Sequence, residues 1–278
     1  MKKIFLAFGL IATFATQGAW AQNQADATTT VKAPETTTTY FLNHAIAEFR
    51  QDTNVNQAYK LQDRSQQYVS YQQEARLGWK LGNDWQLVGI GAQVATTYGG
   101  NAPNTTTWTS ADPSISLGHP IYKSPEFVMT GEARRYFRGF ASTIKNQTDQ
   151  YQYYLRASYT PTARWEIFNL VSPHYYAQPQ FADADTTYYL EGKTVASYRM
   201  SKWWTLGVGQ YTQLEYHSRT ETGLNVEVFP AVEIDLAPNL MIWPAIFVPV
   251  AAQAAVGGGA TSASVDNTRA ELYIMATL

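Results

Sequence analysis

The stretch Val69–Gly82, VSYQQEARLGWKLG, alternates apolar and polar residues with a period of two. Successive side chains of an extended strand point to opposite faces, so this period predicts a β-strand with one apolar and one polar face. Leu77 and Trp79 lie on the apolar face and Arg76 on the polar face, while Gln73 is a polar exception on the apolar face. A soluble β-sandwich buries such an apolar face in a core, whereas a membrane barrel turns it toward lipid.

The first 21 residues, MKKIFLAFGLIATFATQGAWA, have the pattern of a signal peptide. Two lysines precede an apolar run shorter than the ~20 residues needed to span a bilayer, and Ala19-Trp20-Ala21 has the small-x-small pattern of a cleavage site. We therefore expect residues 1–21 to direct export. Residues 22–39 are rich in Thr and Ala without periodicity and are expected to form a flexible lead-in. Residues 40–278 are then the folded domain.

The composition excludes several classes of protein. The 278 residues contain no cysteine, which excludes thiol chemistry and disulfides. The formal net charge of −2 becomes −4 once the two lysines of the signal are removed, too small to predict nucleic-acid binding. After residue 21 no apolar run approaches about 18 residues, which argues against membrane helices. The mean hydropathy of −0.29 still allows a barrel, because barrel strands turn only half of their residues to lipid.

Alternation of this kind continues almost to the last residue, and no segment has a sustained helical period. It predicts about 12 strands. Their expected ranges are Tyr40–Arg50, Gln67–Leu81, Trp85–Tyr98, Pro113–Tyr122, Glu126–Arg138, Tyr151–Thr160, Arg164–Tyr176, Thr187–Met200, Trp204–His217, Leu224–Leu236, Leu240–Ala251 and Thr268–Leu278.

The connections between these strands alternate between short and long. Tight turns are expected at residues 82–84, 123–125, 161–163, 201–203 and 237–239. Longer polar loops are expected at 51–66, 99–112, 139–150, 177–186, 218–223 and 252–267. The alternation predicts a transmembrane up-and-down antiparallel β-barrel with short periplasmic turns and longer extracellular loops. A Greek-key sandwich would mix connection lengths irregularly.

Tryptophan supports the same architecture. An interfacial aromatic girdle lies where the strands of a barrel leave the bilayer, beside its turns. Six tryptophans fall close to the predicted short turns: Trp79, Trp85, Trp165, Trp203, Trp204 and Trp243.

The last strand carries a resemblance to a known class. In Thr268–Leu278, TRAELYIMATL, alternate residues such as Leu272 and Ile274 form an apolar face up to the end of the chain. This resembles bacterial outer-membrane β-barrels, whose final strand alternates in the same way and closes the barrel. Ala276 and Leu278 depart from the class, which often has aromatic residues there. The resemblance implies the cell outer membrane as location and the lipid bilayer as partner, without naming a family.

If the apolar faces meet lipid, the polar faces line the lumen. A lipid-facing Arg or Lys at the midplane costs about 2–4 kcal/mol, which explains the alternation. Arg135 alone falls on the wrong face of its strand. The predicted pore-lining residues are Glu74, Arg76, Lys80, Glu132, Arg134, Arg138, Arg156, Glu166, Glu191, Lys193, Arg199, Glu215, His217, Glu227, Glu233, Asp235, Arg269 and Glu271.

Two strands stand out within this pattern. Leu224–Leu236 contributes only acids to the lumen, Glu227, Glu233 and Asp235, which form either a patch that favours cations or partners for arginines on neighbouring strands. Leu240–Ala251 has apolar residues on its expected lumen face, and its prolines interrupt the ladder. A subunit contact or packing inside the barrel would explain this second strand.

No catalytic arrangement is evident. Barrels of the resembled class include an outer-membrane phospholipase, which uses a Ser and a His two residues apart on its lipid-facing wall. Here His217 and Ser218 are adjacent and would point to opposite faces. His44, His119 and His174 are interpreted as isolated. We predict no catalytic residue, no metal site, no cofactor and no nucleic-acid partner.

The sequence therefore predicts a porin-like channel for passive diffusion of ions or small hydrophilic solutes across the outer membrane. One alternative is a non-conducting barrel with a filled interior whose long loops make surface contacts. A membrane-embedded hydrolase and a soluble periplasmic sandwich are further alternatives. The solute and the oligomeric state stay open.

Overall fold

The computed structural model describes residues 44–56, 68–98, 105–137, 149–177, 186–217, 222–253 and 268–277. The expected signal peptide at residues 1–21 and the lead-in at 22–39 lie outside this part of the chain. Within it, no helix is long and apolar enough to cross a membrane.

Strands account for almost all of the described residues. They are β1 (Ala45–Asn56), β2 (Tyr68–Lys80), β3 (Gln86–Tyr98), β4 (Thr105–Ser110), β5 (Ser114–Lys123), β6 (Phe127–Phe137), β7 (Asp149–Thr162), β8 (Trp165–Ala177), β9 (Thr186–Arg199), β10 (Trp204–His217), β11 (Thr222–Ala237), β12 (Leu240–Gln253) and β13 (Arg269–Thr277).

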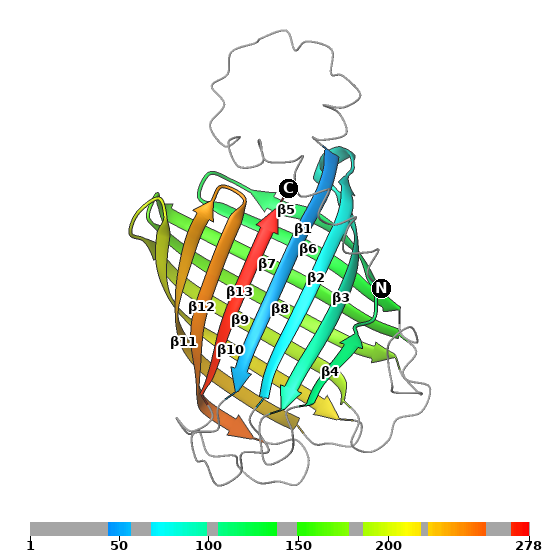
Figure 1. Ribbon diagram of the computed structural model, residues 1–278. Coiled ribbons are helices and arrows are strands. Elements are labelled where there is room, and N and C mark those ends of the chain that lie inside the picture. The colour runs from blue at the N-terminus through cyan, green and yellow to red at the C-terminus, as the bar shows by residue number, and fades with distance from the viewer. Residues whose placement is uncertain are drawn as a thin grey trace, which may run out of the picture.

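The strands form one closed barrel (Figure 1). Apart from β4 and β5, strands that are neighbours along the chain pair antiparallel, and β1 pairs with β13 to close the sheet. β4 and β5 pair with successive parts of β3, so together they fill one of 12 strand positions. The predicted up-and-down barrel is confirmed.

Two predicted loop boundaries are wrong. Residues 99–112 were expected to be a loop, but β4 lies within them and pairs with the second half of β3. β4 is mostly threonine, whose branched side chain suits a pleated sheet. Pro113, which has no N–H, separates β4 from β5. β1 likewise continues past Arg50 to Asn56, because these residues pair with both β2 and β13.

The short turns all lie at one end of the barrel, beside the end of β13 (the upper end in Figure 1). The first of these is the 3-10 turn η2 (Gly82–Asp84), where Asn83 and Asp84 have φ of 58° and 62°. Asn and Asp tolerate this left-handed region better than most residues. Every connection at the opposite end passes through residues outside the described part.

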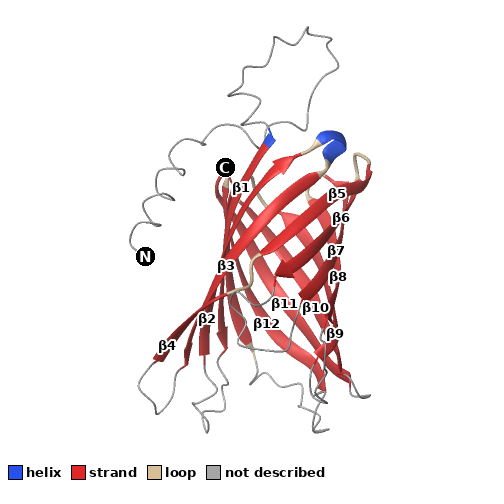
Figure 2. Ribbon diagram, turned by 90° about the vertical axis from the view of Figure 1, so that its right-hand side faces the viewer, coloured by secondary structure: helices blue, strands red, loops and turns tan. Residues whose placement is uncertain are grey.

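The burial of side chains is inverted relative to a soluble protein. Leu77 and Val208 are 55% and 61% exposed, whereas Arg76 is only 6% exposed. In β5 the serines are buried while Ile115 and Leu117 point outward. Figure 2 shows the strands tilted around the barrel, with no described helix packed over their outer face. A soluble sandwich would bury its apolar faces, so the outer wall is one that faces lipid.

Candidate functional site: the barrel interior

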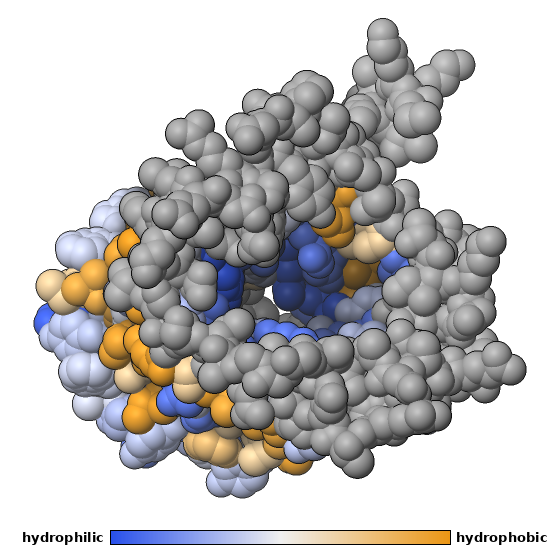
Figure 3. All heavy atoms as spheres, turned by 90° about the horizontal axis from the view of Figure 1, so that it is seen from below, coloured by the Kyte–Doolittle hydropathy of each residue, from blue (hydrophilic) through white to orange (hydrophobic). Residues whose placement is uncertain are grey.

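The inner wall of the barrel is polar. Seen from the end with the longer connections, hydrophilic residues surround a central opening, and hydrophobic residues gather at one side of it (Figure 3).

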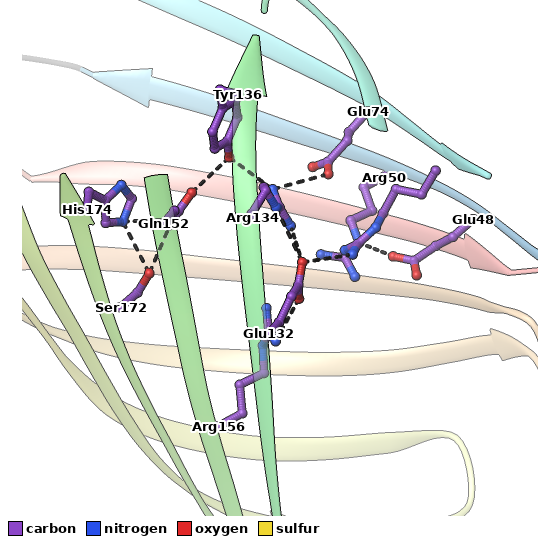
Figure 4. A network of polar contacts seen from close by, with 11 residues as sticks. Glu48, Arg50, Glu74, Glu132, Arg134, Tyr136, Gln152, Arg156, Ser172 and His174 are labelled. Atoms are coloured by element: carbon purple, nitrogen blue, oxygen red, sulfur yellow. Dashed lines mark hydrogen bonds and ion pairs between the residues drawn. The ribbon is translucent and has the colours of Figure 1, made fainter. Parts of the chain in front are cut away.

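An arginine cluster surrounds Glu132 on β6 (Figure 4). The Glu132 carboxylate lies 3.0 Å from Arg134 Nη2, 2.9 Å from Arg156 Nη1 and 3.4 Å from Arg76 Nη2. Arg76 is on β2, which is separated from β6 by β3 and β5. Side chains of strands that are not neighbours can meet only across the concave face of the sheet. These predicted pore-lining residues therefore point into the barrel together.

The cluster extends along β1 and β2. Glu74 Oε1 lies 3.7 Å from Arg134 Nη1, and Glu48 forms an ion pair with Arg50 on β1. Glu48 and Arg50 were absent from the predicted set. The same alternation would have found them, because both lie on the inward parity of a strand that was correctly expected to include them.

A chain of neutral polar side chains continues the cluster across β7 and β8. Arg134 Nη1 donates to the Tyr136 hydroxyl at 3.0 Å, and this hydroxyl donates to Gln152 Oε1 at 2.8 Å. Gln152 Nε2 donates to Ser172 Oγ at 3.2 Å, and His174 Nε2 lies 3.2 Å from the same Oγ. These contacts link three adjacent strands on their inner face.

The interpretation of His174 as isolated was wrong. Ser172 and His174 are two residues apart, so both point to one face, and this spacing was visible in the sequence. Glu191 Oε2 is 3.5 Å from His174 Nε2. Ser172 is 0% exposed, however, so no substrate can reach its hydroxyl in this arrangement. The side chain of His217 lies outside the described part.

An aromatic patch forms the wall on β10, β11 and β12. Phe229 and Phe247 are buried with ring centroids 4.4 Å apart, and the Trp243 ring lies 5.7 Å from that of Phe229. Tyr211 packs edge-on against Phe247. The Phe229 ring fits against β10 because Gly209 has no side chain: a Cβ there would lie 2.3 Å from Phe229 Cζ.

Two predicted pore-lining cations cover these rings. Lys193 Nζ lies 4.1 Å from the centroid of Trp243, and Arg269 Cζ lies 3.7 Å from that of Phe247. Cations are attracted to the negative faces of aromatic rings. The wall therefore holds both positive charges in fixed positions.

Arg269 also contacts two carboxylates and one side-chain amide. Its Nη2 lies 2.9 Å from Glu227 Oε2, and its Nη1 lies 2.7 Å from Glu271 Oε2 and 2.9 Å from Asn54 Oδ1. Glu227 is 4% exposed. Since β11 and β13 are separated by β12, this contact also crosses the inner face.

The aromatic patch accounts for the unusual composition of β12. Its apolar residues pack inside the barrel against β10 and β11, one of the two explanations expected from the sequence. Trp243 was also placed in the girdle beside a short turn, and that part of the prediction was wrong. Trp204 and Trp165, by contrast, are 40% and 48% exposed on the outer wall beside their turns.

The remaining predicted residues lie nearer the two ends. Lys80, Glu166 and Arg199 are exposed toward the short turns. Glu233 interacts electrostatically with Asp235 and with Glu166 and Arg199 at the same end of the barrel. Glu227 is six residues from Glu233, about 20 Å along the strand, so the three acids of β11 do not form one patch. Glu215 accepts a hydrogen bond from Gln213, and Arg138 lies outside the described residues.

Arg135, the predicted exception, does point outward. Its guanidinium carbon lies 5.2 Å from the ring centroid of Phe137 and 5.9 Å from that of Tyr151. It is eight residues from Phe127, about 27 Å along the strand or about 20 Å across a bilayer at a tilt of 35–45°, and two residues from the last residue of β6. From this position its long side chain can extend toward the polar interface.

A closed antiparallel barrel with an apolar outer wall and a charged interior has the fold of outer-membrane β-barrels. The chain is similar in structure to the COG4313 outer membrane channel of Pseudomonas putida F1, with a TM-score of 0.59, 8% identity, and 84% of this chain and 95% of that one covered. It is also similar to the NanC porin, with a TM-score of 0.50 and 9% identity. This match covers 84% of this chain and 100% of that one. No protein-family model and no curated protein matches the sequence. The likeness is therefore one of fold.

Proposed function

We propose that this chain is an outer-membrane channel for the passive diffusion of ions or small hydrophilic solutes. The observation that carries the proposal is a wall of charged and hydroxyl-bearing side chains around the central opening of a closed barrel (Figure 3). Such a lumen holds water and conducts without any catalytic step. Two structures similar to this fold are described as a channel and a porin.

The span of the ion pairs supports an open lumen. Arg76 and Glu132 lie three strand positions apart, and Arg269 and Glu227 lie two positions apart. Contacts of this span follow the curve of the wall and leave the centre to water. The alternative of a filled, non-conducting barrel draws its support from the aromatic patch, which narrows one side.

The test is single-channel conductance of the purified, refolded protein in a planar bilayer, with the reversal potential recorded under a salt gradient. We expect discrete, reproducible steps, and the sign of the reversal potential reports the preferred ion. Protein whose gel mobility shifts on heating is correctly folded, and heat-denatured protein is the control. Folded protein that gives no steps would overturn the proposal in favour of the filled barrel.

A further inference from the structure

The outer wall carries two groups of neutral polar residues whose outward neighbours along the same strands are mostly apolar. The first, the β1–β3 amide patch, consists of Gln51, Gln73 and Gln93, which face one another across adjacent strands. Gln73 Nε2 donates to Gln51 Oε1 at 3.3 Å, and Gln51 Nε2 donates to Thr53 Oγ1 at 3.3 Å. Arg50, Asp52 and Glu74 beside them lie on the inward parity, so Gln51 and Gln73 point outward, and Gln93 is paired with Gln73 on the same face. Gln73 is the exception within the apolar face of β2.

The second group, the β8–β10 amide patch, consists of Asn169, Thr194, Gln210 and Thr212, all but Thr212 exposed. Thr194 Oγ1 donates to Asn169 Oδ1 at 2.8 Å, and Gln210 Nε2 donates to Thr212 Oγ1 at 3.1 Å. Its central strand β9 is six positions around the barrel from β2, and the barrel has 12 positions. The two patches therefore lie on opposite sides.

Both patches lie at the same depth. Gln73 is six residues from Trp79, and Gln210 is six residues from Trp204, both tryptophans at the short-turn end. Six residues extend about 20 Å along a strand, or about 15 Å across a bilayer at a tilt of 35–45°. This is near the middle of an apolar band about 25 Å tall.

Polar groups at this depth are costly in lipid, which offers no hydrogen bonds. An amide has two N–H donors and an oxygen that can accept two hydrogen bonds, and the bonds between described residues use only part of this capacity. Each patch also adjoins an outward glycine. A Cβ on Gly91 would meet nothing within 4 Å, and one on Gly192 would meet only atoms about 4 Å away. Glycine in a strand often marks the close approach of another backbone.

We propose that these two patches are the surfaces through which copies of this chain associate in the membrane. Amides donate and accept equally, so a neutral amide patch is complementary to another of the same kind. The bilayer holds every copy at the same depth and orientation, which brings the patches of two copies to the same height. Lipid acyl chains lie at the same depth as the patches, but they cannot form hydrogen bonds with them.

The absence of cysteine in the natural chain makes disulfide cross-linking a direct test. Single variants Gln73→Cys and Thr194→Cys, alone and co-expressed, are oxidised in isolated outer membranes and analysed on non-reducing gels. The matched control is Ile246→Cys, an exposed residue six positions from the start of β12 and midway between the patches around the barrel. We expect covalent dimers at several times the control yield. Patch yields no higher than that of Ile246→Cys would overturn the proposal.

A second measurement does not depend on a cysteine. The mass of the unmodified barrel in nanodiscs should exceed that of one chain, and the variant Gln51→Leu, Gln73→Leu, Asn169→Leu, Gln210→Leu should have the mass of one chain. Its heat-dependent gel mobility checks that the barrel has folded. A monomeric unmodified protein would contradict the inference. Both results are independent of conductance, so failure here is distinguishable from failure of the proposed channel.

Discussion

Arg269 and Glu227 form an ion pair across an intervening strand, with Nη2 of the arginine 2.9 Å from Oε2 of the glutamate. Because β12 lies between their strands, this pair depends on the curvature of the closed barrel. It joins the strand that closes the barrel to the aromatic patch.

Replacing Arg269→Met should destabilise the barrel by about 3–5 kcal/mol, because it leaves the buried carboxylate of Glu227 without its partner. Equilibrium unfolding in urea, followed by gel mobility or tryptophan fluorescence, measures the change. The double variant with Glu227→Gln should recover a large part of the loss. A double variant as unstable as the single one would show that the ion pair is not the cause.

Gly209→Val should force the Phe229 ring away from β10 and into the lumen, since the new Cβ would overlap the ring. We expect a smaller single-channel conductance and a loss of about 1–3 kcal/mol of stability from overpacking. Gly91→Val is the control, because its Cβ would have open space. Equal conductance in the two variants would refute the packing described for the aromatic patch.

Glu132→Gln should shift the ion preference of the lumen toward anions, since three arginines would lose a shared negative charge. One charge at about 4 Å in water corresponds to about 1 kcal/mol, or about fivefold in the anion-to-cation permeability ratio. Reversal potentials under a salt gradient measure the ratio. Glu166→Gln, at the exposed end of the barrel, should change the permeability ratio less. A larger change with Glu166→Gln than with Glu132→Gln would contradict the position of Glu132 in the lumen.

Val208→Arg tests the orientation of the wall. Val208 is 61% exposed four residues from Trp204, so the new charge would face the hydrocarbon and cost up to about 2–4 kcal/mol. Folding yield into lipid vesicles, read from heat-dependent gel mobility, should fall. Arg135→Leu, on the same outer surface but near the end of β6, should fold at least as well as the natural protein. If Val208→Arg folds without loss, that wall does not face lipid.

Much of the architecture was predictable because every strand of a barrel in lipid must place apolar residues outward and polar residues inward. Leu77 and Arg76 differ by one position and must face opposite environments, so the period of two was preserved almost throughout. The boundaries of β4 and β1 were less predictable. Their polar residues suited a loop equally well, and pairing with β3 or β13 decided the outcome.

The interior was predicted as a list of residues but not as an arrangement. Parity predicted an inward position for Glu132, Arg76 and Arg269, yet it contains no information on which strands lie two or three positions away in space. Trp243 shows the limit clearly, because closeness to a turn suggested the outer girdle while its parity placed it inside. The contact between Ser172 and His174, by contrast, follows from local spacing alone, since residues two apart on a strand share a face.

The sequence by itself determined the inside and outside of this protein, because lipid penalises polar side chains one residue at a time and therefore leaves a local signal. The tertiary structure alone decided which charges neutralise one another, which aromatic rings narrow the lumen, and that two amide patches stand on opposite walls. These relationships join strands that are distant along the chain, and they follow from closure of the sheet.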